Sequence, residues 1–351
     1  MGNVVSLKTR QDISLKEVDS RLEDLLKDLD KVPEDERDVE YYRRRKYSIS
    51  TNKTYRAGIY DFVAWTGVPF PFPTTSNLIC QYLVDRKYLA ASTLRVYISG
   101  IGYLHKMCRF RDPTNKHLDP YAQEIFDVLK GVEKEQVEEH RRAITQAPPL
   151  TLAQLVAMVK SIEDRLMGLR DKAYLLVATY GAFRQSEVSQ LQWEQFSRVE
   201  GGYAIRLEIT KQDQLNQEKK FKGLPVMDSP LICPVEALDD WLKVSGITEG
   251  PVFRGVTRHE TLLESAITHT TANRIVKRLA AKAGIENPRQ YSGHSLRSTF
   301  ITELRKIDIT DAKIVKQTLQ KVETLDTYDR GDLVLKDNPA SDFGYLLKNY
   351  L

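Results

Sequence analysis

Cysteine is scarce in this sequence, and long apolar runs are absent. Its 351 residues include three cysteines, Cys80, Cys108 and Cys233, which form no C-x-x-C pair. Such scattered cysteines are typical of a reducing compartment without a disulfide framework. No apolar stretch approaches the roughly 20 residues that span a bilayer, and the N-terminus lacks the apolar core of a secretory signal. We therefore expect a cytoplasmic protein without membrane attachment.

Histidine is equally sparse, and its spacing does not suggest metal ligation. The six histidines form neither an H-E-x-x-H motif nor a Cys/His ligand pattern, which are arrangements typical of zinc sites. We predict no metal and no cofactor.

The charge of the chain is distributed unevenly. Residues 1–40 hold twelve Asp and Glu against seven Lys and Arg, a net charge of −5. Since the whole chain carries +4, residues 41–351 carry +9. The body of the protein is therefore distinctly basic, as in many nucleic-acid-binding proteins, and the acidic N-terminal segment is set apart from it.

Composition and periodicity divide the chain into five parts. Residues 15–32 have the spacing of an amphipathic helix, which either packs on its own domain or contacts a partner. Between Glu133 and Pro149 apolar residues thin out and charge rises, so we expect a domain boundary there. The predicted parts are an acidic N-terminal tail (1–40), a helical bundle (41–143), a linker (144–149), a second domain (150–336) and a C-terminal helix (337–351).

The expected fold class is mainly α, with one small antiparallel sheet in the second domain. Alternating and β-branched residues predict a hairpin formed by residues 203–210 and 220–226. Ser50 or Thr51, Ser92 and Thr151 are expected to cap helices. The predicted helices cover residues 51–65, 78–88, 93–107, 120–132, 151–162, 169–179, 235–244, 271–283, 295–306, 309–317 and 322–328.

Four short segments of the second domain carry residues suited to phosphate chemistry. His294 and Arg297 lie one helical turn apart, so both can project from one face. Arginine offers planar, bidentate donors to phosphate oxygens, and histidine can donate or move a proton. Taken singly, each segment also fits an ordinary amphipathic helix or a structural ion pair. The segments are GAFRQSE with Arg184 and Glu187, ITK with Lys211, GHSLR with His294 and Arg297, and DTY with Tyr328.

The order and spacing of these segments resemble the tyrosine recombinase (phage integrase) family, in a Cre-like layout. The family pattern is G-x-x-R-x-x-E/D at a helix start, a Lys on a β-hairpin, an H-x-x-R helix and a Tyr nucleophile. The resemblance extends over roughly residues 45–351, because the N-terminal bundle also looks like the family's core-binding domain. It implies a site-specific recombinase that cleaves and rejoins double-stranded DNA.

The mechanism that this resemblance implies is phosphoryl transfer without metal or ATP. Tyr328 attacks the scissile phosphate and forms a 3′-phosphotyrosyl intermediate. Arg184, Arg297 and His294 hold the phosphate, since developing charge on its oxygens must meet fixed cations. Lys211 protonates the departing 5′-oxygen, and Glu187 supports Arg184 or His294.

Two of these assignments have competitors nearby. Lys211 is preferred because it directly follows the first strand of the hairpin, as the family's lysine usually does. Tyr328 is preferred because it follows the H-x-x-R motif at the family's distance. The competitors are Lys219, Lys220 and Lys222 on the hairpin, and Tyr345 and Tyr350 in the C-terminal tail.

One position departs from the family pattern. Nine residues before its tyrosine the family has a His or Trp, usually after Gly, but this chain has Leu319 after Thr318. Leucine cannot donate a hydrogen bond to phosphate. Either Gln317 or Gln320 replaces that donor, or the site works with one donor fewer. The departure supports an alternative function, a DNA-binding accessory protein with weakened catalysis.

Basic residues in both domains are candidates for contacts with DNA phosphates. The resemblance also implies a tetramer on two DNA sites, a nucleoid-associated location and a C-terminal helix exchanged between protomers. A telomere resolvase or type IB topoisomerase would use the same chemistry. The candidate DNA contacts are Arg43, Arg44, Arg45, Lys46, Lys53, Arg56, Arg95, Arg141, Arg142, Arg274, Lys277, Arg278 and Lys282.

Overall fold

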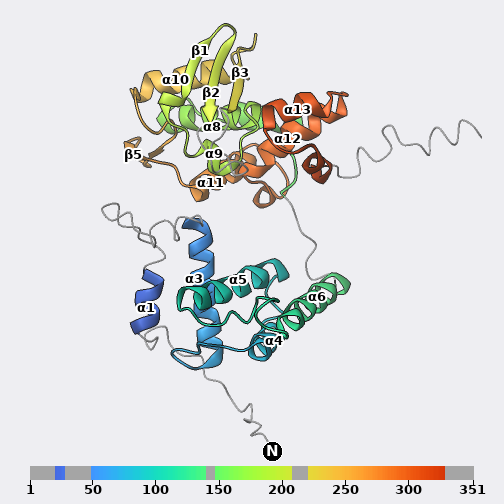
Figure 1. Cartoon of the computed structure of the whole chain (residues 1–351). Helices are drawn as coiled ribbons and strands as arrows, with labels where there is room; N and C mark the ends of the chain where they lie inside the picture. Colours follow the sequence, from blue (N-terminus) through green and yellow to red (C-terminus); the bar gives the residue numbers. More distant parts are fainter. Residues whose placement is uncertain (1–19, 28–48, 140–146, 208–219, 329–351) are drawn as a thin grey trace, which may run out of the picture. The chain divides into compact units, whose positions relative to one another are not determined.

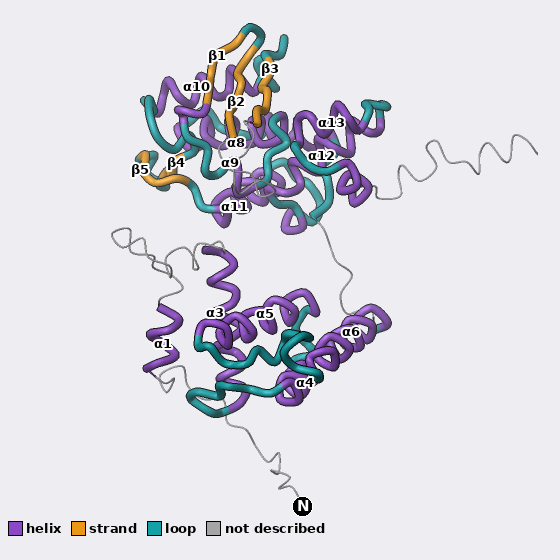
Figure 2. The backbone as a smooth tube through the Cα atoms, in the orientation of Figure 1, coloured by secondary structure: helices purple, strands orange, loops and turns teal. Residues whose placement is uncertain are grey.

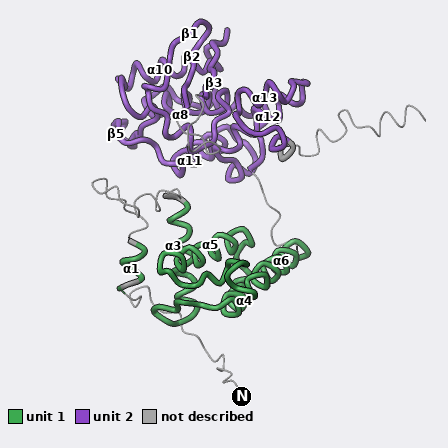
Figure 3. Tube along the Cα trace, in the orientation of Figure 1, with its two compact units in different colours: residues 1–145 green, residues 146–351 purple. Residues whose placement is uncertain are grey.

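A computed structural model of the chain describes residues 20–27, 49–139, 147–207 and 220–328 (Figure 1). The chain divides into two compact units, residues 1–145 and residues 146–351 (Figure 3). Each unit has its own apolar core, and each is described by itself below.

Unit 1 is a helical bundle. Its elements are α1 (Ser20–Lys27), α3 (Ile49–Thr66), α4 (Ser76–Asp85), α5 (Ala91–Met107) and α6 (Ala122–Glu138). The core joins apolar faces of all five helices, among them Leu22 of α1, Phe62 of α3, Tyr82 of α4, Ile98 of α5 and Leu129 of α6. Phe62 and Tyr82 meet edge to face with ring centroids 5.2 Å apart, an arrangement that aromatic pairs favour.

Two of the predicted helix caps in unit 1 are wrong. α3 already begins at Ile49, so Ser50 and Thr51 lie inside the helix. α5 begins at Ala91 after Ala90, so Ser92 is not its cap. The cap of α4 is Thr75, whose hydroxyl accepts a hydrogen bond from the Leu78 amide at 3.3 Å.

The helix predicted to end at residue 132 is longer, because the charged stretch after that residue continues α6 to Glu138. Buried Gln136 ties the last turn of α6 to the segment before α5. The Gln136 side chain donates to the carbonyls of Lys87 and Leu89 at 2.7 Å each and accepts from the Ala91 amide at 3.2 Å. Because most residues around Gln136 are charged, the sequence did not indicate that its side chain is buried.

Unit 2 is mostly helical, with two small antiparallel sheets (Figure 2). Thr151 caps α7 in a capping box with Gln154, as predicted. α8 is the central helix: its second half is buried on all sides, which explains the apolar run from Ala173 to Ala178. The helical elements are α7 (Leu152–Lys160), α8 (Leu166–Tyr180), α9 (Gln185–Val188), η2 (Trp193–Gln195), α10 (Pro234–Ser245), α11 (His269–Lys282), η3 (Pro288–Gln290), α12 (Gly293–Lys306), α13 (Asp311–Thr318) and η4 (Val322–Tyr328).

The predicted hairpin is present as β2 (Gly202–Leu207) and β3 (Lys220–Pro225), paired antiparallel with Ile205 opposite Lys222. A third strand, β1 (Phe196–Val199), pairs antiparallel with β2 and was not predicted. A second, two-stranded sheet joins β4 (Arg254–Val256) and β5 (Leu262–Ala266), which the sequence did not indicate either. The predicted fold class, mainly α with a small antiparallel sheet, is confirmed.

Candidate active site

The turn between α8 and α9 places Arg184. α8 ends at Tyr180, Gly181 follows it, and Ala182 adopts a left-handed conformation with φ of 43°. Phe183 then turns inward and is buried. A Cβ on Gly181 would lie 2.1 Å from Cε2 of Phe183, so only glycine leaves room for this ring. The turn ends at Arg184, which begins α9.

Glu187 holds Arg184 through two hydrogen bonds. The Arg184 backbone amide donates to Glu187 Oε2 at 2.9 Å, and its guanidinium donates to Oε1 at 2.7 Å. The Arg184 side chain is 21 % exposed and that of Glu187 only 8 %. This is the pairing that the spacing suggested, and it fixes the guanidinium at the start of α9.

The start of α12 lies against the start of α9. Ser292 caps α12 by accepting a hydrogen bond from the His294 amide at 3.2 Å. The Gly293 amide donates to Oδ1 of Asn273 at 3.0 Å, which anchors α12 on α11. A Cβ on Gly293 would lie 2.9 Å from Cγ of Gln185, so the two helix starts are packed closely. His294 is half-buried and directly follows Gly293. Gly293 in turn packs against Gln185, the residue after Arg184.

Arg297 lies one turn further along α12 and is only 1 % exposed. Its Nη1 donates to the carbonyl of Ala182, in the turn that precedes Arg184. Its Nη2 donates to the Thr318 carbonyl at 3.0 Å and to Oε1 of Gln320 at 2.5 Å. Arg297 therefore ties the α8–α9 turn to the end of α13.

A lysine of β3 reaches the same turn. Lys222 is 1 % exposed, and its Nζ donates to the carbonyls of Gly181 at 2.7 Å and Ala182 at 3.1 Å. Its ammonium also lies 4.7 Å from the centroid of the Phe183 ring, within the range of a cation–π contact.

Burial and the neighbouring charged side chains both shift the pKa of Lys222. Burial lowers the pKa of Lys222 to about 7. The Glu187 carboxylate acts in the opposite direction, and the guanidinium groups of Arg297 and Arg184 lower the pKa further. The four charged side chains thus interact around one turn.

Gln317 and Gln320, the two candidates for the missing donor, lie in different settings. The Gln317 side-chain amide donates to the carbonyls of Tyr180 at 2.8 Å and Gly223 at 2.7 Å. Its Oε1 accepts from the Gly223 amide at 3.2 Å. Gln317 therefore joins α13 to α8 and β3. Gln320 instead bonds to Arg297 through Oε1 and is 5 % exposed.

The backbone of Tyr328 ends η4, the last described element. Leu325 of η4 is buried with Ile301 of α12 and Ile314 of α13. The Arg305 guanidinium donates to the Leu325 carbonyl at 3.0 Å. These contacts fix the segment that leads to Tyr328. The Tyr328 side chain, Lys211, Lys219, Tyr345 and Tyr350 lie outside the described residues.

The candidate DNA contacts differ in their surroundings. Lys53, Arg274 and Lys277 are exposed, and no acidic partner lies within ion-pair distance of them among the described residues. Others hold intramolecular contacts: Arg56 lies over the Tyr60 ring at 5.6 Å, Arg95 pairs with Glu133 at 3.1 Å, Arg278 bonds to Asp171, and Lys282 bonds to Glu163. Arg43, Arg44, Arg45, Lys46, Arg141 and Arg142 lie outside the described residues.

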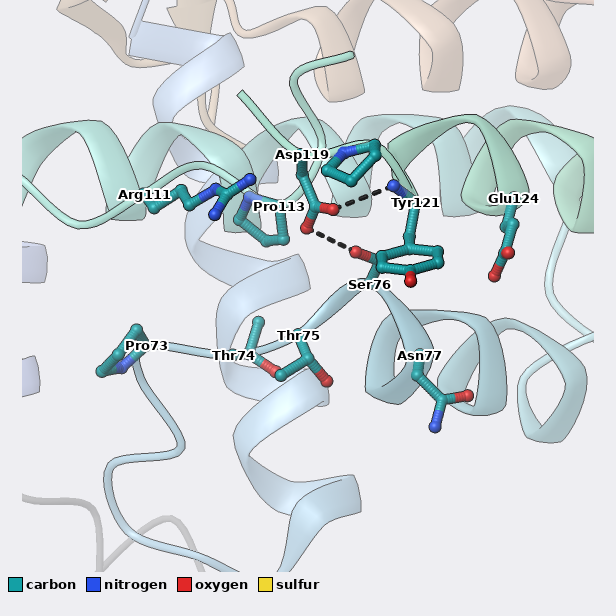
Figure 4. Close-up of a pocket in the computed structure, with 11 residues that line it drawn as sticks. Pro73, Thr74, Thr75, Ser76, Asn77, Arg111, Pro113, Asp119, Tyr121 and Glu124 are labelled. Carbon is teal, nitrogen blue, oxygen red and sulfur yellow. Dashed lines mark hydrogen bonds between the residues drawn. The ribbon is translucent and has the colours of Figure 1, made fainter. Parts of the chain in front are cut away.

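A pocket in unit 1 contains none of the predicted site residues (Figure 4). It lies at the start of α4, where the Ser76 hydroxyl donates to Asp119 at 2.6 Å and the Tyr121 amide donates to the same carboxylate at 2.9 Å. The Ser76 bond lowers the pKa of Asp119. These contacts fasten the loop before α6 to α4, so we read the pocket as structural.

Within the described ranges, no cluster of three or more His, Cys, Asp and Glu side chains could hold a metal ion. None of the helices found there is both long and apolar enough to cross a membrane.

Comparison with known proteins gives the family of this chain. Residues 149–325 match the Phage integrase family, and the chain belongs to this family of tyrosine site-specific recombinases. It is 29 % identical over 296 residues to an integrase/recombinase xerD homolog of Selenomonas ruminantium, covering 82 % of this chain and 84 % of that protein. It is 22 % identical over 261 residues to the recombinase cre of Escherichia phage P1, covering 70 % and 72 %.

Solved structures share the fold. The XerH site-specific recombinase bound to a palindromic difH substrate superimposes with a TM-score of 0.58 and 16 % identity, covering 94 % of this chain and 84 % of that one. A lambda integrase dimer bound to a core site gives a TM-score of 0.53 and 16 % identity, covering 83 % and 93 %. The predicted relationship to the tyrosine recombinases is thus confirmed.

Proposed function

We propose that this recombinase cleaves a DNA strand by attack of Tyr328 on the scissile phosphate, without a metal ion or ATP. Tyr328 Oη gives up its proton to His294 as its bond to phosphorus forms, and the bond from phosphorus to the 5′-oxygen breaks. The 5′-oxygen leaves with a proton from Lys211, and a 3′-phosphotyrosyl link remains. Attack by a 5′-hydroxyl of a partner strand reverses these changes and releases Tyr328, so the covalent intermediate conserves the bond.

One observation carries this proposal: α12, which holds His294 and Arg297, packs against the turn that leads to Arg184, although the two segments lie far apart in the sequence. Arg297 bonds to Ala182, two residues before Arg184, and the residue before His294 packs against the residue after Arg184. Two guanidinium groups can stabilise the charge that develops on the non-bridging oxygens of the phosphate. Glu187 would orient Arg184 for this task.

The partner we propose is double-stranded DNA, bound by a tetramer that brings two sites together. The XerH and lambda integrase structures were both obtained with DNA. In this chain, exposed Lys53, Arg274 and Lys277 are suited to phosphate contacts. We further propose that the C-terminal segment, residues 337–351, joins neighbouring protomers, and that the protein is associated with the nucleoid.

A nicked suicide duplex tests the chemistry. The binding site is first selected from a random-sequence pool by the full-length protein, and a nick beside the scissile phosphate then lets the cleaved fragment diffuse away. We expect a covalent protein–DNA adduct with the wild type and none with Tyr328→Phe at equal DNA occupancy. Persistence of the adduct in Tyr328→Phe would assign the nucleophile to another residue.

The same assay separates the enzyme from a DNA-binding accessory protein with weakened catalysis. The accessory role predicts salt-dependent binding to the selected site without an adduct. If affinity barely changes between low and physiological salt, DNA is not the partner, because phosphate contacts release counterions and weaken steeply with salt.

A further inference from the structure

The end of α13 brings Gln320 to Arg297. The helix ends at Thr318, and the next residue, Leu319, adopts a left-handed conformation with φ of 53°, which is uncommon for a residue other than glycine or asparagine. The residue after this turn, Gln320, is 5 % exposed, and its Oε1 accepts from Nη2 of Arg297 at 2.5 Å. The turn thus delivers the Gln320 carboxamide to the guanidinium.

The chemistry of this contact fixes the orientation of the carboxamide. A guanidinium has only donors, so Gln320 must present its oxygen to Arg297 and point its NH₂ group elsewhere. Because the oxygen and nitrogen of a carboxamide are only about 2 Å apart, Nε2 lies within about 5 Å of Nη2 of Arg297. Nε2 is buried and has no hydrogen-bond partner among the described residues.

Gln317 is not free for the same task. Both its carbonyl oxygen and its NH₂ group bond to the backbone of Tyr180 and Gly223. Gln320 therefore remains as the glutamine of this segment with an unused donor. Buried donors are rarely left without an acceptor in native proteins, and an acceptor supplied by a ligand would explain this one.

The geometry points to Gln320 as a phosphate-contacting residue: Nε2 donates to a non-bridging oxygen of the scissile phosphate while Oε1 stays on Arg297. This role rests on the proposed function and adds a donor that Leu319 cannot supply. Arg297 and Gln320 are both buried, so the role requires a local opening on DNA binding that leaves the bond between them intact.

Three substitutions separate donation to phosphate from positioning of Arg297. Gln320→Leu removes both halves of the carboxamide. Gln320→Glu keeps an acceptor for Arg297 but removes the donor, and Gln320→His restores a donor without the amide oxygen. With the nicked duplex, we expect adduct formation to slow about 10²–10³-fold in the Leu and Glu variants, the usual effect of losing one oxyanion donor. The His variant should stay within about tenfold of the wild type, and all should bind DNA comparably.

A phosphorothioate at the scissile position gives a second readout, because sulfur is a weak hydrogen-bond acceptor. One diastereomer should slow the wild type but should not slow Gln320→Leu any further. Gln317→Leu is the matched control: it also loses a carboxamide near the end of α13, and it should keep the full wild-type thio effect whatever it does to stability.

The outcomes distinguish the two levels of the proposal. A wild type that binds its site but forms no adduct refutes the proposed function, and the role of Gln320 with it. A wild type that forms the adduct together with a fully active Gln320→Leu variant refutes the role of Gln320 alone. An active Glu variant with an inactive His variant would make Gln320 a residue that only positions Arg297.

Discussion

Lys222 should make the stability of unit 2 depend on pH. Its ordinary pKa is 10.5, and burial lowers it to about 7 in the folded chain. Between these values the unfolded chain holds a proton that the folded chain lacks, so the free energy of unfolding rises as pH rises through this window. Below pH 7 both states are protonated, and the dependence on Lys222 disappears.

The magnitude follows from the shift. Each unit of pKa difference is worth about 1.4 kcal/mol, so the full shift corresponds to at most about 5 kcal/mol across the window. From pH 7 to pH 9 we expect a gain of about 2 kcal/mol, because the group is half-titrated at the lower end. Lys222→Met removes the titrating amine and with it this gain.

Urea unfolding of the full chain measures the effect. Trp193 and Trp241 report on unit 2, and a Trp65→Phe background removes the signal from unit 1. The difference in unfolding free energy between Lys222 and Lys222→Met proteins should grow by about 2 kcal/mol from pH 7 to pH 9. Lys243→Met, which removes an exposed lysine of α10, is the matched control. A difference that stays constant or shrinks would refute a buried amine held on two carbonyls.

Three further changes test the site and the DNA contacts. Gly181→Ala places a Cβ where Phe183 lies 2.1 Å away, so urea unfolding should reveal a loss of about 1–3 kcal/mol; unchanged stability would contradict the close approach. Glu187→Gln removes the charge that holds Arg184 at 2.7 Å, and adduct formation should slow about tenfold or more, whereas an unchanged rate would mean that Glu187 does not orient Arg184. Lys277→Gln should lower the salt slope of DNA binding by about one. The control is Lys282→Gln, which should change the slope less because the Lys282 ammonium bonds to Glu163. Equal slopes for the two variants would count against Lys277 as a phosphate contact.

Sequence patterns predicted those parts of the fold that depend on local periodicity. The helices of unit 2 and the β2–β3 hairpin follow from apolar spacing, and Thr151 was predicted as a cap because it directly precedes a helical pattern; its capping-box partner Gln154 was not predicted. The caps of α3 and α5 were wrong because a Ser or Thr near a helix start is only a statistical signal. β1, β4 and β5 were not predicted, because strands that are short and contain no buried residue have little apolar alternation.

The role of Lys222 was harder to predict, since a lysine in a strand usually faces water. A signal was nevertheless present. Side chains alternate along β3, so Lys222 shares a face with Leu224, and that face is buried. The burial of the Lys222 ammonium is offset by hydrogen bonds to the carbonyls of Gly181 and Ala182, which lie about 40 residues away in sequence. Patterns within a short stretch of sequence cannot predict hydrogen-bond partners that lie so far apart along the chain.

The end of α8 explains why these distant residues meet. A helix leaves its last carbonyls without partners inside the helix, and its C-terminal end carries partial negative charge. Here the side chain of Gln317 bonds to Tyr180, Lys222 bonds to Gly181 and Ala182, and Arg297 also bonds to Ala182. Side chains of α13, β3 and α12 thus donate hydrogen bonds to carbonyls at the end of α8 and in the turn after it. These bonds hold the turn that leads to Arg184. Because Lys222 and Arg297 share one carbonyl, substitutions at the two positions should be non-additive, and the proposed phosphate site should form or fail as one unit.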